Sequence, residues 1–358
     1  MPANTMNWTV DRVAALPGWT SGVALTDSGR LVVSAPQAMQ PAVMPTVSEI
    51  VAGHAVALGA EIADQLVSVQ GLRAGPGETV WALDTGAVGG LDTADPARAA
   101  LWQIDLANMS VHRRYGLQEA MGSTSYPNDL AVDTNTGTAY IIDAGGEPAN
   151  AMIVLDLHTG TARRVLAGHD TMKAARASSP EAMSAAGQPL TTQPSTGEAV
   201  PVEVGASGIT VSPDGDTVFW NRNDELFSIP AHLLRTRAGE PSTEDRGAID
   251  AAITRWPVRP FISDGLDPDN EGNVVFTDLT HSGAQRLDPR TGGYQQIAAH
   301  PAISWPDGVA AAPDGAIYLT SSQFHLGPMF HDHDDRHAPF GIFRLTPPKP
   351  SQDRNKES

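Results

Sequence analysis

The stretch "PDGVAAAPDGAIYLTS" (306–321) contains two Pro-Asp-Gly corners, one before an apolar run and one before a β-rich run. Hairpin turns of type I′ and related types need positive φ, which an Asp-Gly pair adopts at little steric cost. The second corner, at 313–315, therefore predicts a hairpin turn between two strands. The first corner, at 306–308, is interpreted as the entry into the first of these strands.

The same pattern recurs along the chain: a polar pair, a Gly, an apolar residue, about six residues ending in Gly, then an apolar or aromatic run. The copies begin near residues 20, 69, 127, 206, 263 and 306, with Leu130 in place of the first Gly in the third copy. Their starts lie roughly 43 to 79 residues apart, which brackets the spacing of four-stranded propeller blades. Six copies indicate six repeated units.

Further strands follow most copies, such as "LWQIDL" (101–106) and "MIVLDL" (152–157). The sixth unit runs out of chain after "GIFRLTP" (341–347), whereas "NWTVDRVAAL" (7–16) has no partner of its own. We therefore predict an all-β fold, a six-bladed β-propeller formed by residues 1–348 as a single domain. The segment 7–16 becomes the outermost strand of the last blade and closes the ring, which protects the sheet edge.

Two segments fall outside the repeat. The segment 170–201 is rich in Ala, Ser, Thr and Pro, and we expect an insertion with one short helix. It is either a passive loop or a lid over the propeller mouth. The charged tail 349–358 is expected to be disordered.

Composition narrows the partners. The net charge of −18 argues against nucleic acid and anionic membranes and favours small molecules or cations. The chain has no Cys and so no disulfide framework. No apolar run approaches the roughly 20 residues of a membrane span, so we expect no membrane insertion. We also expect a monomer. The start "MPANTMNWTV" lacks the features of a secretion signal. The expected protein is cytoplasmic or the mature form of an exported protein.

Several stretches resemble the Yellow and major royal jelly protein family, especially its bacterial members. They include "VWALDTG" (80–86), "YPNDLAVD" (126–133), "GITVSPDGDTVFW" (208–220) and "PFGIFRL" (339–345). The resemblance covers most of the chain in order and implies a six-bladed propeller. It implies no single activity, because the family includes proteins linked to dopachrome conversion, binders of biogenic amines, and storage or signalling proteins. More distantly, the loops resemble those of gluconolactonase and regucalcin propellers.

The loops that enter the six inner strands place polar residues at one mouth of the central channel. These are Ser21, Gln70, Asn128 with Asp129, Ser207, Asp264 and Asp307. Three carboxylates among neutral oxygens suit a hard divalent cation, Ca²⁺ or Mg²⁺ rather than Zn²⁺. The resemblance to gluconolactonase-like propellers implies that Asn128 or Asp129, Asp264 and Asp307 bind it. Ser21 stands where those enzymes have a Glu, and an Asp before Gly is also a common turn residue.

Other side chains near the mouth complete the predicted site. Trp19, Tyr126 and Trp305 each lie two residues before a loop position and either stack on a ligand or pack between blades. With Ser21, Gln70 and Ser207 they are the predicted substrate-binding residues. Asp129 and His325 are the predicted acid–base residues. The run "MFHDHDDRH" (329–337) has residue types that bind Zn²⁺ or Cu²⁺, but a solvated loop is the favoured interpretation.

Two classes of function remain. The first is an enzyme at the channel mouth that hydrolyses a lactone-type substrate with a divalent ion, or isomerises a cyclic or quinonoid one. The second is a non-catalytic binder of small aromatic or amine ligands, in which acidic and aromatic side chains hold a cation. A stoichiometric metal ion favours the first, and amine binding by metal-free protein favours the second.

Overall fold

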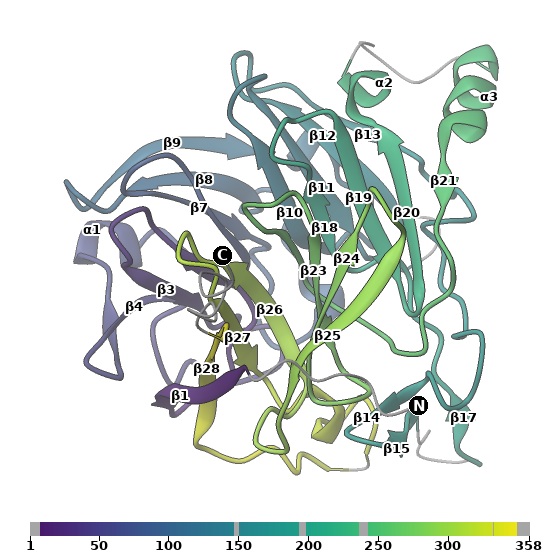
Figure 1. The fold of residues 1–358 in the computed structure, drawn as a ribbon. Coiled ribbons are helices and arrows are strands. Elements are labelled where there is room, and N and C mark those ends of the chain that lie inside the picture. The colour runs from purple at the N-terminus through teal and green to yellow at the C-terminus, as the bar shows by residue number, and fades with distance from the viewer. Residues whose placement is uncertain (1–7, 147–149, 193–197, 236–242, 332, 349–358) are drawn as a thin grey trace, which may run out of the picture.

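Six four-stranded antiparallel sheets make up the body of the protein (Figure 1). The computed structural model describes residues 8–146, 150–192, 198–235, 243–331 and 333–348. The sheets are called blades 1 to 6 in the order of their inner strands along the chain. The predicted six-bladed β-propeller is confirmed.

Each blade runs from an inner strand to an outer strand. Blade 1 contains β2 (Val23–Leu25), β3 (Leu31–Ser34), β4 (Val47–Val51) and β5 (His54–Ala57), and blade 2 contains β6 (Val69–Ala74), β7 (Thr79–Asp84), β8 (Ala100–Asp105) and β9 (Ser110–Gly116). Blade 3 contains β10 (Pro127–Asp133), β11 (Thr138–Asp143), β12 (Ala151–Asp156) and β13 (Ala162–Val165). Blade 4 contains β18 (Ile209–Val211), β19 (Thr217–Arg222), β20 (Glu225–Pro230) and β21 (Thr254–Arg255). Blade 5 contains β22 (Leu266–Pro268), β23 (Val274–Asp278), β24 (Gly283–Asp288) and β25 (Gly293–Ala299), and blade 6 contains β26 (Pro306–Ala311), β27 (Ile317–Ser321), β28 (Phe340–Thr346) and β1 (Thr9–Leu16).

The inner strands form a closed ring. β2 contacts β6, β6 contacts β10, β10 contacts β18, β18 contacts β22, β22 contacts β26, and β26 contacts β2. In blade 6, β1 pairs with β28, with Thr9 opposite Thr346 and Leu16 opposite Phe340, and Figure 1 shows the two strands side by side. The N-terminal strand therefore covers the edge of β28, as predicted.

Apolar side chains fill the spaces between neighbouring blades. Tyr140 of blade 3 and Trp220 of blade 4, both fully buried, belong to one cluster. Every residue of β11 is buried, because neighbouring blades cover both faces of this sheet. This explains why its sequence, "TAYIID", is a nearly continuous apolar run without polar alternation. Of the two corners in 306–321, the second turns as expected, with Gly315 at a φ of +81° between β26 and β27.

The segment between blades 3 and 4 forms two small hairpins. β14 (Ser184–Ala185) pairs with β15 (Gln188–Pro189), and β16 (Thr191–Thr192) pairs with β17 (Val200–Pro201). The described residues of 170–201 contain no helix, so the expected short helix is replaced by these hairpins. The first turns at Ala186 and Gly187, whose φ values of +48° and +76° match a tight hairpin turn and not a helix.

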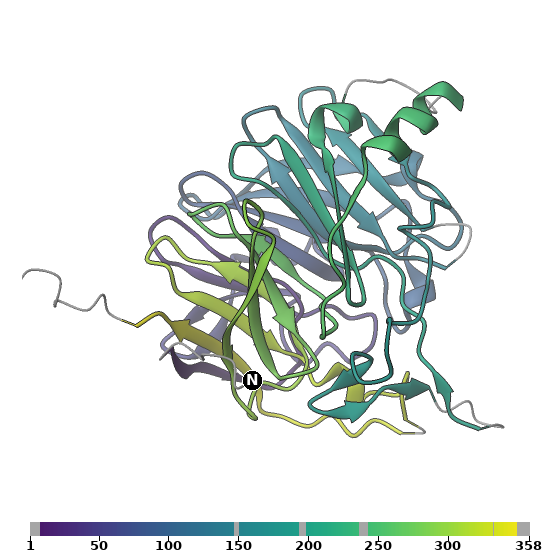
Figure 2. The same cartoon turned by 45° about the vertical axis from the view of Figure 1, so that its right-hand side comes forward.

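Short helices connect some strands. They are α1 (Ala60–Ala63), α2 (Ala231–Arg235), α3 (Thr243–Ala252) and the 3₁₀ turns η1 (Leu91–Thr93), η2 (Gln118–Ala120) and η3 (Phe324–Leu326). Figures 1 and 2 place the hairpins β14–β17 at the end of the molecule opposite α2 and α3. Among the described residues, no helix has the length and apolar character needed to cross a bilayer. The tail 349–358 lies outside the described residues.

Candidate functional site

Glycines bring the six inner loops together at one mouth of the channel. A Cβ atom on Gly208 would lie 2.0 Å from the carbonyl oxygen of Asp264, and one on Gly308 would lie 2.2 Å from that of Ser21. Only glycine allows the backbones of neighbouring blades to approach this closely. In the five loops that have it, the Gly of the repeat therefore places the polar residue against the next blade, which turns a linear pattern into a ring of side chains.

The ring surrounds a small cavity of about 20 Å³, which has room for at least one water molecule. Of the predicted site residues, the structure brings Ser21, Gln70, Asn128, Asp129, Asp264 and Asp307 to its wall. Ser207 lies beside them, where its carbonyl oxygen accepts a 2.9 Å hydrogen bond from Asn128 Nδ2. The residues chosen from the repeat thus lie together.

A chain of hydrogen bonds links three of these residues to a buried tyrosine. Tyr126 Oη donates to Gln70 Oε1 at 2.8 Å, and Gln70 Nε2 donates to Ser21 Oγ at 2.9 Å. Ser21 Oγ in turn donates to Asp307 Oδ1 at 3.1 Å. Ser21 therefore positions the Asp307 carboxylate. Burial raises the pKa of Tyr126, so its hydroxyl stays protonated and donates the first hydrogen bond of the series.

Asp264 and Asp307 carry the unusual electrostatics of the ring. Burial raises the pKa of Asp264 to about 7, and the nearby charge of Asp129 adds to this rise. Burial and then the charge of Asp264 raise the pKa of Asp307 well above its usual value. Trp305 Nε1 donates to Asp264 Oδ2 at 3.3 Å, a contact too weak to offset the burial. Two carboxylates that line one cavity and interact in this way need a shared proton or a cation.

Arg73 also lines the ring cavity, and it is not among the site residues predicted from the sequence. Its Nη2 lies 2.9 Å from Asp129 Oδ2 and donates to the carbonyl oxygens of Ile209 and Leu266. Its Nε lies 3.7 Å from Asp267 Oδ1. Asp129 also accepts from the N–H of Ile209 at 3.1 Å. The Asp129 carboxylate is thus occupied by an ion pair and backbone donors.

The predicted aromatic residues are buried beside the mouth. Trp19 and Trp305 both pack against Phe324, with ring centroids 6.0 and 5.4 Å apart. Trp305 also stacks on His325, at 5.8 Å between centroids and 13° between planes. Trp305 therefore contacts both His325 and Asp264.

His325 is a neutral side chain in an apolar setting. Burial, and then the charge of His331, lower its pKa to about 4. Its Nδ1 is buried and has no hydrogen-bond partner among the described residues. A group with so low a pKa is a weak base at neutral pH. The structure places it behind Trp305 and does not bring it to the wall of the ring cavity.

The hairpin segment covers the mouth next to Trp305. Its residues Met183 and Leu190 belong to one apolar cluster with Trp305 and Phe330, and Figure 2 shows the hairpins beside the yellow segment that follows β27. Thr280 Oγ1 donates to the carbonyl oxygen of Ala182 at 3.0 Å. The segment is therefore packed against residues beside the ring.

Further anchors hold this segment in place. The N–H of Ser178 donates to Asp224 Oδ2 at 2.9 Å, and Asp224 is fully buried in the turn between β19 and β20. The N–H of Ala186 donates to the carbonyl oxygen of Leu279 at 3.0 Å. The segment is therefore tied to blades 4 and 5.

The His/Asp run 331–337 is mainly a surface segment. His333 and Asp335 pair at 3.0 Å with largely exposed side chains. Arg336 is an exception, because its side chain is 4% exposed, lies over the Trp19 ring and donates to the carbonyl oxygen of Met39 at 2.7 Å. Asp332 lies outside the described residues.

The ring offers a mixed donor set for a hard cation. In the described part of the chain, no group of three or more His, Cys, Asp or Glu side chains could hold a metal ion. Two carboxylates, Asp264 and Asp307, face the cavity with the amide of Asn128. Because Asn128 Nδ2 donates to Ser207, its Oδ1 is left for another partner. Carboxylate and amide oxygens are ligands that Ca²⁺ and Mg²⁺ accept, so the residues present fit such an ion.

The sequence of the chain matches one known protein family. Residues 67–326 match the major royal jelly protein family. The chain belongs to this family. The matched region runs from β6 to η3 and contains five of the six ring loops, whereas the loop of Ser21 precedes it. A comparison with the curated proteins finds no match in sequence.

Solved structures with a similar fold include several enzymes. A gluconolactonase from Xanthomonas campestris is 14% identical with a TM-score of 0.55, and the match covers 97% of this chain and 92% of that one. A streptogramin B lyase is 12% identical with a TM-score of 0.51, and the match covers 95% of this chain and 98% of that one. A luciferin-regenerating enzyme is 11% identical with a TM-score of 0.51 and 95% coverage of both chains. At these identities the likeness shows the fold alone.

Proposed function

We propose that this protein hydrolyses lactone-type small molecules at the channel mouth with the help of a divalent cation. Asn128, Asp264 and Asp307 hold the ion, and Ca²⁺ or Mg²⁺ suits these oxygen ligands better than Zn²⁺. When bound, such an ion polarises a carbonyl group and makes a water molecule more acidic. Isomerisation of a cyclic or quinonoid substrate would use the same groups.

The observation that carries the proposal is the pair of half-buried carboxylates at one cavity. Asp264 and Asp307 come from neighbouring blades, and both line the cavity of about 20 Å³. Burying two like charges costs several kcal/mol unless a counter-charge or a proton offsets it. A fold rarely keeps such a cost at a conformationally fixed position without a functional reason. A cation in the cavity offsets the repulsion and supplies the chemistry.

The remaining residues have supporting roles. Ser21, held by the Gln70–Tyr126 chain, fixes the Asp307 carboxylate as the acceptor for the proton of the attacking water. Trp305 and the hairpin segment keep bulk water from the ring. Of the two acid–base residues expected from the sequence, Asp129 is paired with Arg73, and His325 has a pKa of about 4. We therefore assign the proton transfer to Asp307.

A specific observation also supports the alternative, a non-catalytic binder. A cavity of about 20 Å³ holds an ion and water but no lactone, so catalysis requires the mouth to widen. Without such movement the ring would bind only an ion, and an aromatic or amine ligand would bind elsewhere at the mouth.

The test combines metal content with turnover. Purified protein is analysed for bound metal, and hydrolysis of glucono-δ-lactone and dihydrocoumarin is followed with and without chelator and added Ca²⁺ or Mg²⁺. We expect that chelator abolishes the activity and that the added ion restores it. We also expect Asp264→Asn to lower kcat/KM by at least about a hundredfold. Asp216→Asn, an exposed carboxylate in the turn between β18 and β19, is the matched control and should keep full activity. Absence of lactone turnover in metal-replete protein would overturn the proposal.

A further inference from the structure

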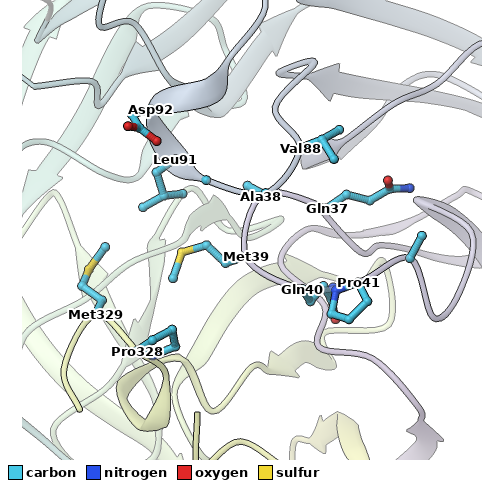
Figure 3. A pocket seen from close by; sticks show the side chains of 13 residues that line it. Gln37, Ala38, Met39, Gln40, Pro41, Val88, Leu91, Asp92, Pro328 and Met329 are labelled. Atoms are coloured by element: carbon cyan, nitrogen blue, oxygen red, sulfur yellow. The ribbon is translucent and has the colours of Figure 1, made fainter. Parts of the chain in front are cut away.

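A second and much larger cavity lies beside the ring. It measures about 870 Å³, which falls within the range of roughly 300–1,000 Å³ typical of small-molecule sites. Three segments form its walls: 37–42 between β3 and β4, 88–92 between β7 and β8, and 328–329 after η3 (Figure 3). We call it the side cleft. Nothing described so far assigns it a role.

Hydrogen bonds between the walls hold the side cleft open. The N–H of Gly89 donates to the carbonyl oxygen of Gln37 at 3.1 Å, which joins the second wall to the first. Arg336, whose side chain is buried and which follows the third wall along the chain, donates to the carbonyl oxygen of Met39 in the first wall. Thr93 Oγ1 donates to the carbonyl oxygen of Val88 at 3.0 Å. A cleft whose walls are fixed before binding loses little entropy when a ligand enters.

The lining of the side cleft is mostly apolar. Its apolar side chains include Ala38, Met39, Val88, Leu91, Pro328 and Met329. Val88 is 54% exposed and Met329 is 38% exposed, which is unusual for large apolar residues. Figure 3 shows Met39, Leu91 and Met329 turned toward the same space from three different walls. Methionine sulfur makes favourable contacts with aromatic rings, so this arrangement suits a flat ring between the two thioethers.

The charges at the side cleft favour an uncharged ligand. None of the thirteen residues that line it is Lys, Arg or His, so an anion would find no counter-charge, and the protein's net charge of −18 repels it. Asp92 is the one acid in the lining, and it is exposed at the rim, where water screens it. The amide of Gln37, which has no side-chain hydrogen bond among the described residues, offers a donor and an acceptor.

The side cleft is separate from the ring but adjoins it through one residue. Tyr126 packs with Ala38 and Ala87 in the apolar cluster under the cleft, while its hydroxyl donates to Gln70 in the ring. No ring residue lines the side cleft. Binding there can therefore be measured without metal and without catalysis.

We propose that the side cleft is a binding site for a small uncharged aromatic molecule of about two fused rings. The ligand lies between Met39 and Met329, contacts Leu91 and Val88, and directs a hydroxyl toward Gln37. This site is independent of the proposed lactone hydrolysis.

The probe for this site is 2-naphthol, titrated calorimetrically into the full-length protein in the presence of chelator. We expect stoichiometric binding to the wild type and at least tenfold weaker binding to Val88→Glu, which places a charge in the apolar lining. Val258→Glu is the matched control, because Val258 is also 54% exposed but lies outside the side cleft. Its affinity should equal that of the wild type. Thermal melts of both variants establish that they are folded.

Two outcomes would overturn the inference. The first is absence of 2-naphthol binding, or an equal loss in both glutamate variants, which would mean that the side cleft is not the site. The second is equal affinity for trans-2-decalol, the saturated analogue, which would mean that the site does not select aromatic rings. Because chelator is present and no lactone is used, neither outcome depends on whether the ring is catalytic.

Discussion

Arg73 Nη2 lies 2.9 Å from Asp129 Oδ2 inside the channel, and both side chains are about nine-tenths buried. The same guanidinium donates to carbonyl oxygens of blades 4 and 5. It thus connects blade 2 to blades 3, 4 and 5, and its single positive charge is shared between the two deeper acids, Asp129 and Asp267. Asp264 and Asp307 at the mouth have no ion pair with Lys or Arg among the described residues, which is why the candidate ion site is there.

Replacing Arg73 by Met should destabilise the protein strongly. The change leaves the Asp129 and Asp267 carboxylates buried without their cation, and breaking a buried pair in this way costs roughly 3–5 kcal/mol. Urea denaturation measures the effect. The control is Arg98→Met, which removes a pair with Asp95 whose side chains are 63% and 44% exposed, and it should change stability by less than about 1 kcal/mol.

A double variant tests the cause of this loss. Asp129→Asn in the Arg73→Met background removes one of the stranded charges while its amide still accepts from backbone N–H groups. We expect the double variant to be more stable than Arg73→Met alone. If the two losses simply add, Arg73 acts through packing and not through charge.

The closure of the ring by β1 predicts a large effect for a residue at its end. Leu16 is 2% exposed and belongs to the apolar cluster between blades 6 and 1. Leu16→Ala should cost roughly 2–5 kcal/mol and increase aggregation, because a loosened β1 exposes the edge of β28. Asp11→Ala, on the exposed side of the same strand, should stay within about 0.5 kcal/mol. Equal stability of the two variants would contradict the closure.

The fold could be predicted from the sequence because the repeat has a local physical cause. Each Asp-Gly or related corner is either a hairpin turn, as at Gly315, or a close approach of two blades, as at Gly308. The hairpin turn and the close approach each require a particular residue at a single position, so both leave a recognisable pattern in the sequence. The unpaired strand at 7–16 was equally visible, since a strand without a partner must close the ring.

The deeper part of the site could not be read in the same way. Arg73 follows the ring residue Gln70 by three positions on β6, and nothing local shows that its side chain reaches blades 3, 4 and 5. The Tyr126–Gln70–Ser21 chain likewise joins three blades. Such contacts depend on the three-dimensional arrangement of the blades. One signal was available: a charged residue in the apolar run of an inner strand is costly unless it has a buried partner.

Asp264→Asn should separate ion binding from folding. In chelator at pH 8 the variant should melt at a higher temperature than the wild type, because it removes the repulsion with Asp307. Saturating Ca²⁺ should stabilise the wild type, by roughly 2.7 kcal/mol at a hundredfold excess over Kd, and the variant much less. Thermal melts over a Ca²⁺ series measure both effects. Identical Ca²⁺ responses of the two proteins would remove Asp264 from the ion site.

His325 predicts how stability changes in mild acid. Its pKa is lowered from 6.5 to about 4 in the folded protein, mainly by burial. Between these values the unfolded chain binds more protons than the folded one, so this residue lowers the free energy of unfolding as pH falls from about 6.5 to about 4. Above pH 6.5 it has no such effect.

The variant His325→Gln removes this titration but keeps a polar side chain of similar length. The difference in unfolding free energy between variant and wild type, measured by urea denaturation, should therefore shift in favour of the variant from pH 7 to pH 4.5. Comparing the two proteins at each pH cancels the titration of the carboxylates, which both share. His54→Gln, at an exposed position on β5, is the control for the effect of a His to Gln substitution at the surface. A pH-independent difference for His325→Gln would mean that the imidazole becomes charged in the folded protein as readily as in the unfolded chain, and that the apolar contact with Trp305 does not hold it neutral.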